Sequence, residues 1–483
     1  MNIYLKKALH YLAGNLFNKI LLIVFLPIFT AFLIPEEYAL YTNYLIFIAF
    51  AGLFYLSGLT QSLFSYFYKE DTQQYRYTLI NSILRTVIFV GLIISVVIVL
   101  FRDRFTIWIT GSSETSSAMI FIVLIIFFEA IYTITLSIVN IMERSEIYAG
   151  LGAVKNIVLL VLFVFGAILN QFGLEQILWY MLVSAGISGI LSAFVLSKIL
   201  REFQTEMAKR FSWEIMKPVL RFGIIMIPGT LGFLTLRVAD RYMLTHFSEG
   251  ALYDVGIYAV GYRIGMIMQF LVSAVSLVYF PYAMKTADTE KAKASFRKIY
   301  NYFLLFGAML GTLVILFSNE IFRVFIDAKY FSAVSIVFVG VISVFLHGVF
   351  NIINLGFYVR QKAGKIAIAV VSGAVINIVL NYFLIPKYGI IGAGTASILA
   401  YIYIVLLNFV AVRKVFVTNY SLWNLTASLL VLGLVSYLNF VLPAGLVVTL
   451  IKALAAVVIL VVISLVLKKK TKPGFMTELL RKK

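Results

Sequence analysis

Residues 217–245 read KPVLRFGIIMIPGTLGFLTLRVADRYMLT, an apolar run long enough to cross a membrane as a helix. Arg237, Asp240 and Arg241 lie in the second half of this run, at a spacing that places them on one helical face. A charge near the centre of a bilayer costs roughly 2.5–3.5 kcal/mol. Such side chains must therefore pair, reach the membrane surface or line a wet cavity. The stretch predicts a membrane helix with a functional polar face.

The whole chain has the same apolar character. It has 483 residues, of which 62% are hydrophobic and 13% charged, a balance that is not typical of soluble globular proteins. We therefore predict an all-α integral membrane protein with 14 transmembrane helices. The predicted spans are about 10–33, 41–68, 78–101, 118–141, 147–169, 175–197, 217–245, 252–284, 297–318, 331–358, 364–385, 390–412, 422–441 and 446–467.

The positive charges of the loops predict the orientation of these spans. With the N-terminus in the cytoplasm, 28 of the 40 Lys and Arg residues fall in inside segments, 5 in outside loops and 7 within spans. Cytoplasmic loops carry the excess of Lys and Arg in membrane proteins. We therefore expect both termini to be cytoplasmic. We expect the basic tail, 468–483, to lie at the inner surface, in contact with membrane lipids.

Several classes of function are disfavoured. The chain has no cysteine, and His10, His246 and His347 lie far apart, so we expect no metal site and no cofactor. The net charge of +19 lies mainly in short loops, which argues against nucleic acid as a partner. The longest outside connections, 102–117 and 319–330, lack the paired carboxylates of a glycosyltransferase or polymerase. We therefore do not expect an enzyme.

The longest cytoplasmic connection predicts the domain organisation. It separates six spans from eight, and the segments 37–41 and 254–258 resemble each other, as internal repeats of transporters do. The expected parts are an N-terminal six-helix lobe (1–197), a linker (198–216), a C-terminal six-helix lobe (217–416), helices 13 and 14 (417–467) and the tail (468–483).

Four motifs resemble a known family. They are LRFGIIMIP (220–228), DRYML (240–244), GIYAVGYRI (256–264) and NIVLNYFLIPKYGIIGA (377–393). They resemble the polysaccharide branch of the multidrug/oligosaccharidyl-lipid/polysaccharide (MOP) flippase superfamily, and most of all the Wzx-type flippases of O-antigen, capsule and exopolysaccharide pathways.

The resemblance implies a fold and a function. Two pseudo-symmetric lobes would form a V around a central cationic cavity. The protein would move an undecaprenyl-diphosphate-linked oligosaccharide from the inner to the outer leaflet of the bacterial cytoplasmic membrane by alternating access. A polysaccharide polymerase and the chain-length machinery are the candidate protein partners, and a monomer is expected. The alternatives are a flippase for the peptidoglycan precursor lipid II and a cation-coupled multidrug exporter.

The basic residues within spans are the candidate binding residues. We expect the cavity to use Lys19, Arg85, Lys155, Arg237, Arg241 and Arg263. Arg85 and Lys155 have a second interpretation as side chains that snorkel to the cytoplasmic surface, and Arg237 and Arg241 as an ion-pair cluster with Asp240. We expect the seventh, Lys452, to snorkel. Glu129 either pairs with Lys19 or carries a coupling H⁺ or Na⁺, for which Asp240 is the other candidate.

Uncharged polar residues complete the candidate site. Those expected to line the cavity are Asn15, Asn18, His347, Asn351, Asn354, Asn377 and Asn381. For the last five, helix–helix packing is the alternative. Pro228 removes a backbone donor within its span, so it is the candidate hinge. Residues 386–389, Pro-Lys-Tyr-Gly, predict a tight turn between two spans.

Overall fold

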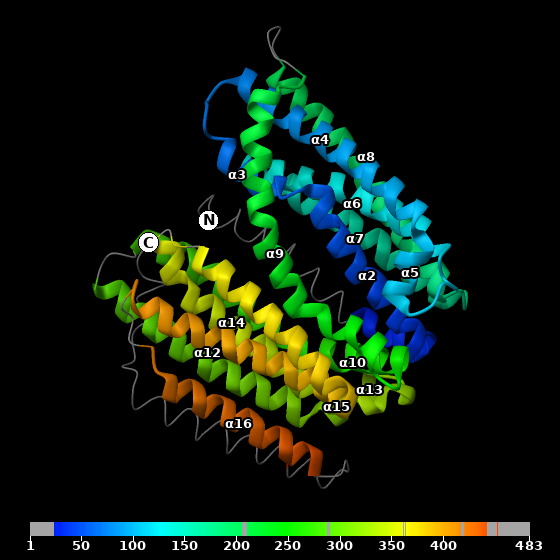
Figure 1. Ribbon diagram of the computed structural model, residues 1–483, viewed down its shortest axis with the longest axis vertical. Coiled ribbons are helices and arrows are strands. Elements are labelled where there is room, and N and C mark those ends of the chain that lie inside the picture. Colours follow the sequence, from blue (N-terminus) through cyan, green and yellow to red (C-terminus); the bar gives the residue numbers. More distant parts are fainter. Residues whose placement is uncertain are drawn as a thin grey trace. The chain divides into compact units, whose positions relative to one another are not determined.

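The computed structural model describes residues 24–204, 210–286, 290–360, 362, 364–416, 420–441 and 452. All regular structure in these residues is helical (Figure 1). The chain forms two compact units, Met1–Gly256 and Ile257–Lys483.

The first unit is a bundle built around α6. Its helices are α2 (Pro35–Leu56), α3 (Leu59–Tyr66), α4 (Gln73–Leu100), α5 (Arg102–Thr110), α6 (Ala118–Ile141), α7 (Ser145–Ile168), α8 (Leu174–Phe203) and α9 (Trp213–Phe247). Helix α6 contacts α2, α3, α4, α7 and α8. Isoleucines such as Ile122, Ile126 and Ile134 are at most 1% exposed and form the core there. Helix α10 (Ala251–Gly265) crosses the boundary between the units.

The second unit surrounds α14. After α10 come η1 (Met266–Met268), α11 (Gln269–Thr286), α12 (Glu290–Leu316), α13 (Ser318–Phe325), η2 (Ala328–Ile336), α14 (Val337–Val359), α15 (Gly364–Arg413) and α16 (Leu422–Val441). Helix α14 contacts α11, α12, α15 and α16, and most of its side chains are buried. A helix that is apolar on all sides is the expected centre of such a bundle.

Eleven helices in the described residues are long and apolar enough to cross a membrane. The chain is thus a multi-pass membrane protein. The total of fourteen stays a prediction, because 10–23 of the first span and nearly all of 446–467 lie outside the described residues. The predicted span 41–68 is corrected: it begins at Pro35 and breaks between α2 and α3, where Ser57 and Gly58 have positive φ.

Helix α15 contains two of the predicted spans and the predicted turn between them. Gly389 has a non-helical backbone, with φ 51° and ψ −131°. The Nδ2 of Asn377 donates to the Oγ of Ser397 over 3.2 Å. Twenty residues of straight helix would separate these two by about 30 Å. Helix α15 therefore folds back on itself at Gly389, as the Pro-Lys-Tyr-Gly turn predicts.

Helix α9 remains one helix from Trp213 to Phe247, with Pro218 and Pro228 inside it. Figure 1 shows that it curves along its length, as expected when prolines interrupt the hydrogen-bond ladder. Helix α9 packs against α2, α3 and α4, so it groups with the first unit rather than with the second. The hinge role of Pro228, the lobe division and the V shape stay predictions.

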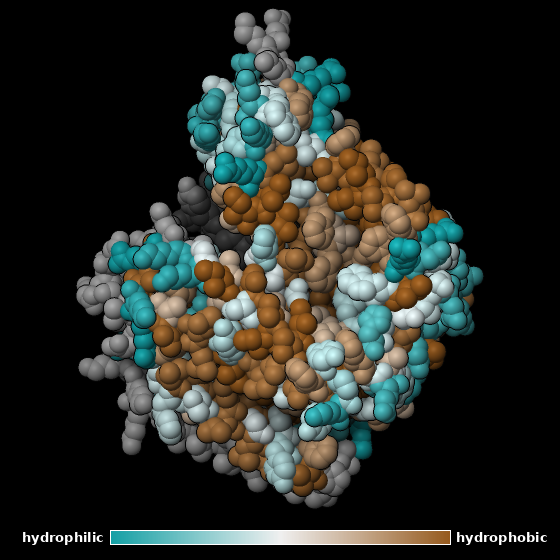
Figure 2. Space-filling view, viewed as in Figure 1, coloured by the Kyte–Doolittle hydropathy of each residue, from teal (hydrophilic) through white to brown (hydrophobic). Residues whose placement is uncertain are grey.

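The surface of the first unit suits a lipid environment. Figure 2 shows apolar side chains across the face formed by α4 and α8. On α4, Phe89, Leu92 and Leu100 are 66%, 52% and 73% exposed. In a bilayer such side chains meet lipid tails, so their exposure carries no cost in free energy.

The break between α2 and α3 allows a close backbone approach to α9. A Cβ atom added to Gly58 would lie 2.2 Å from the carbonyl oxygen of Gly223, and one added to Gly223 would lie 2.5 Å from that of Ser57. Gly58 also has φ +69°, a conformation that suits glycine. Both glycines are thus required for α3 and α9 to meet.

We expect Gly58→Ala to lower the free energy of unfolding by about 2–4 kcal/mol, because it adds strain at positive φ and a clash with Gly223. The matched control is Gly52→Ala on α2, where a Cβ meets nothing within 4 Å. Denaturation of the purified protein in detergent measures both. Equal stability of the two variants would contradict the requirement for glycine at position 58.

Candidate functional site

The structure pairs two of the candidate residues within the first unit. The Nζ of Lys155 on α7 lies 2.5 Å from the Oε1 of Glu129 on α6. It also lies 4.6 Å from the centroid of the Tyr132 ring, a cation–π contact. The two charged side chains are 23% and 27% exposed. Glu129 therefore has a partner on the next helix, and in this arrangement Lys155 does not snorkel to the surface.

Backbone contacts hold this ion pair in place. The Oγ of Ser184 on α8 donates to the carbonyl oxygen of Lys155 over 2.8 Å. The adjacent Asn156 donates to the carbonyl oxygen of Gly152 over 2.7 Å. Helix α7 is thus anchored to α8 at the level of the pair. An acid and a base held together within a membrane bundle neutralise each other, and removing one of them leaves the other as an uncompensated charge.

The charged cluster on α9 is divided by burial. Asp240 is 2% exposed, Arg241 is half-buried and Arg237 is exposed. Helical spacing thus places the three residues on one face of α9, but they differ in how far they are buried. The carboxylate of Asp240 lies in the protein interior and the guanidinium of Arg237 lies at its surface.

Polar residues that the sequence analysis missed fix this part of α9. The hydroxyl of Tyr242 donates to the carbonyl oxygen of Asn43 over 3.2 Å. The Nδ2 of Asn43 donates to the Oγ1 of Thr245 and to the carbonyl oxygen of Ile109, each over 3.0 Å. These bonds join α2, α5 and α9 directly beside the charged cluster. A buried asparagine within an apolar span was the signal in the sequence.

Arg263 occupies a defined face of α10. A Cβ atom at Gly261 would lie 2.2 Å from the carbonyl oxygen of Ala333, and one at Gly265 would lie 2.6 Å from Gly340. These glycines therefore press against η2 and α14. Two residues along a helix correspond to a turn of about 200°, so Arg263 lies on the opposite face of α10 from both glycines. Its side chain is half-buried there.

Three of the predicted cavity asparagines are buried inside the second unit. Asn354, Asn377 and Asn381 are at most 2% exposed. Asn354 accepts from Asn408 over 2.7 Å, and Asn381 donates to Asn377 over 3.1 Å. This geometry favours the packing alternative for these three residues.

The other polar candidates on α14 are more accessible. Asn351 and His347 are half-buried, and the ring of His347 stacks on Tyr401 at 6.3 Å between centroids. Arg85 is exposed on α4. Asn15, Asn18 and Lys19 lie outside the described residues. The structure thus brings Lys155 and Glu129 together, and the single cavity expected for all the candidates stays a prediction.

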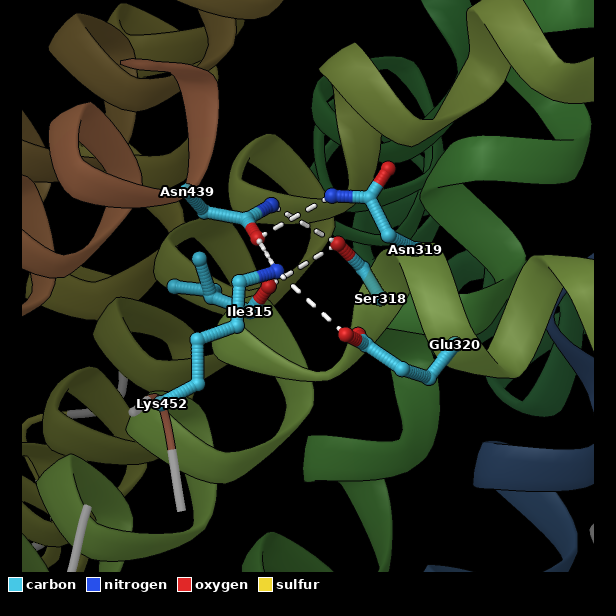
Figure 3. A network of polar contacts seen from close by, with 6 residues as sticks. All are labelled: Ile315, Ser318, Asn319, Glu320, Asn439 and Lys452. Atoms are coloured by element: carbon cyan, nitrogen blue, oxygen red, sulfur yellow. Dashed lines mark hydrogen bonds and ion pairs between the residues drawn. The ribbon is translucent and has the colours of Figure 1, made fainter. Parts of the chain in front are cut away.

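The expectation for Lys452 is wrong. Its side chain is fully buried, with the Nζ 3.0 Å from the Oδ1 of Asn439 and 3.5 Å from the Oε1 of Glu320 (Figure 3). Asn439 also accepts from Asn319 over 3.2 Å and donates to Ser318 over 3.0 Å. Lys452 does not snorkel because an acid from α13 and an amide from α16 meet its charge inside the protein.

We expect Lys155→Met and Glu129→Gln each to destabilise the protein, because each leaves a half-buried polar partner. The double variant is expected to recover part of the loss, with a coupling free energy of about 0.5–3 kcal/mol. Thermal unfolding in detergent of the four forms measures this. The control is Lys217→Met at an exposed position of α9. Strictly additive losses would show that the ion pair carries no energy.

We expect Lys452→Met to lower the free energy of unfolding by about 3 kcal/mol, because it leaves Glu320 and Asn439 without their cation. Chemical denaturation compares it with Lys414→Met, which alters an exposed lysine beyond the end of α15. Equal stability of the two variants would refute a structural role for the buried lysine.

Comparisons with known proteins identify the family and the fold. The family model described as polysaccharide biosynthesis protein matches residues 4–287. A probable low-salt glycan biosynthesis flippase, Agl15 of Haloferax volcanii, is 27% identical over 152 residues, which are 30% of this chain and 32% of that protein. An uncharacterized membrane protein of Methanocaldococcus jannaschii is 28% identical over 235 residues, 46% of this chain and 44% of that protein. The matches span less than half the length of these curated relatives.

Solved structures share the fold over most of the chain. The lipid II flippase MurJ in an inward closed conformation has a TM-score of 0.77 at 15% identity and covers 96% of this chain and 100% of its own. An inward-facing MATE multidrug transporter of the MOP superfamily has a TM-score of 0.66 at 14% identity, covering 82% of this chain and 95% of its own. At 14–15% identity, these likenesses show a shared fold. The chain belongs to the polysaccharide biosynthesis protein family.

Proposed function

We propose that this protein translocates a polyprenyl-diphosphate-linked oligosaccharide, with undecaprenyl as the bacterial carrier, from the inner to the outer leaflet by alternating access. The family and the flippase-type fold support a lipid-linked glycan as the cargo. The observation that carries the proposal is the excess of basic over acidic side chains within the apolar spans.

The ion pairs of the structure sharpen this charge balance. Lys155 lies against Glu129, and Lys452 lies against Glu320, so these two bases are neutralised within the protein. The other basic residues within predicted spans are Lys19, Arg85, Arg237, Arg241 and Arg263, and the other acid there is Asp240, so bases still outnumber acids by sequence. Such an excess suits an anionic diphosphate and disfavours the organic cations that a multidrug exporter would carry.

Arg263 is the strongest single candidate for the diphosphate. Its helix is positioned by Gly261 and Gly265, which hold α10 against its neighbours and leave Arg263 on the opposite face. A guanidinium offers a planar fork of donors that matches phosphate oxygens bidentately. A rigid backbone beneath that fork lowers the entropic cost of binding.

Glu129 and Asp240 remain the candidates for coupling to H⁺ or Na⁺. Glu129 is held by Lys155, so it would couple only if that pair opens during the cycle. Asp240 is buried on α9, where protonation would remove a charge from the protein interior.

The cellular setting is also a proposal. The flippase would act in the cytoplasmic membrane with both termini inside, as a monomer supplied by glycosyltransferases and followed by a polymerase and chain-length machinery. The two curated relatives with named organisms are archaeal, so an archaeal polyprenyl carrier is the equivalent cargo in such a setting. A lipid II flippase has the same mechanism with another head group.

We expect Arg263→Gln to reduce translocation of a fluorescent polyprenyl-diphosphate oligosaccharide roughly tenfold or more at limiting substrate, because a charge-assisted hydrogen bond contributes about 1.5–3 kcal/mol. Arg263→Lys is expected to retain part of the activity, since it keeps the charge and loses the fork. The rate is measured in proteoliposomes, where a quencher added outside removes the fluorescence of the labelled substrate in the accessible leaflet.

Lys217→Gln is the matched control, because Lys217 is exposed at the start of α9. A lipid-linked glycan without the diphosphate is the matched substrate. Equal rates for Arg263→Gln and the wild type, or for the two substrates, would overturn the cationic site. Preference for a peptidoglycan precursor over the oligosaccharide would favour lipid II as cargo.

A further inference from the structure

Helix α5 has the features of a helix at the membrane surface. It has nine residues, too few to cross a bilayer, and follows α4 after Phe101. Thr106, Ile109 and Thr110 are at most 3% exposed, while Ile107 and Trp108 are 47% and 54% exposed. One face of α5 thus packs on the protein, and the other presents an apolar surface at the end of a spanning helix.

A pocket of about 440 Å³ opens on this helix. It is lined by Phe101, Arg104, Phe105 and Trp108, residues that follow the helical spacing i, i+3, i+4 and i+7. Three aromatic rings and one guanidinium therefore share one stripe. Such a lining suits a molecule with an apolar body and an anionic end.

An apolar path leads from the pocket along α4. Val96, Val97 and Leu100 are 57%, 42% and 73% exposed, and Phe101 at the pocket is 49% exposed. A lipid tail lying along this part of α4 would reach the pocket with its polar end. The path thus favours a membrane lipid over a soluble ligand.

The charges beside the pocket are arranged for an anion. Arg102 has Asp103 at 3.8 Å, whereas Arg104 makes no ion pair within the described part of the chain. An exposed ion pair between a basic side chain and an anionic head group contributes up to about 1 kcal/mol. Arg104 is therefore the residue that would select the head group.

We propose that this pocket binds an anionic phospholipid, with the phosphate on Arg104 and one chain along α4. The bound lipid would also brace α5 against α9. The ring of Trp108 stacks on Tyr242 at 5.2 Å between centroids, and the Nε2 of His246 lies 2.7 Å from the carbonyl oxygen of Trp108. This site is independent of the proposed cargo and needs no transport to be measured.

Tryptophan fluorescence tests the proposal. Substituting Trp179, Trp213 and Trp423 by Phe leaves Trp108 as the reporter among the 4 tryptophans. The protein is reconstituted in phosphatidylcholine vesicles that contain either brominated phosphatidylglycerol or brominated phosphatidylcholine at the same fraction. We expect phosphatidylglycerol to quench Trp108 with an apparent affinity about fivefold higher.

Arg104→Gln is expected to abolish that preference, and Arg102→Gln, beside it but outside the pocket, is expected to keep it. Equal quenching by the two lipids in the otherwise unchanged protein would overturn the proposal. A preference that persists in Arg104→Gln would do the same.

A second measurement separates lipid from soluble anion and from misfolding. We expect phosphatidylglycerol to raise the unfolding temperature of the wild-type chain in nanodiscs and to leave that of Arg104→Gln unchanged. The α-helical content of the variant is compared with that of the wild type to show that it folds. Inorganic pyrophosphate added to phosphatidylcholine nanodiscs should leave the temperature unchanged. An Arg104-dependent rise with pyrophosphate alone would assign the pocket to a soluble phosphate and overturn the lipid proposal.

Discussion

The cost of an ionised side chain in an apolar bundle is the constraint on which the rest of this structure depends. Roughly 2.5–3.5 kcal/mol for each unpartnered charge is a large fraction of the stability of a domain. The structure meets this cost locally: Glu129 faces Lys155 within one unit, and Glu320 faces Lys452 within the other. Each pair joins different helices, so the charges also specify which helices lie together.

Close backbone contact between helices is the second feature that holds the bundles together, in addition to the ion pairs. Apolar side chains give little preference between lipid and protein, so helices in a membrane associate through small residues and polar bonds. Gly261 and Gly265 bring α10 against η2 and α14, while Asn354 and Asn408 join α14 to α15. One face of α10 is therefore held in place by its glycine contacts. The opposite face of the same helix carries Arg263, the candidate binding residue.

The sequence predicted the helical class, most spans and the turn at Gly389, because apolar length and turn chemistry are local properties. It did not predict the break at Gly58, whose reason is the backbone of Gly223, more than a hundred residues away. The partners of Lys155 and Lys452 were missed for the same reason. Glu129 is one span away from Lys155, but the choice between Lys155 and Lys19 depends on helix packing. The bond from Asn377 to Ser397 likewise depends on the stretch of helix that returns after the turn.

The close contact of Gly58 and Gly223 prevents lipid chains from passing between two helices. With carbonyl groups of one helix against the Cα positions of the other, the seam between α3 and α9 leaves no room even for a methyl group at this level. A prenyl or acyl chain is wider than that gap. The seam is therefore closed as a lateral portal in this conformation, and lipid cannot slip between these two helices at the level of the glycines.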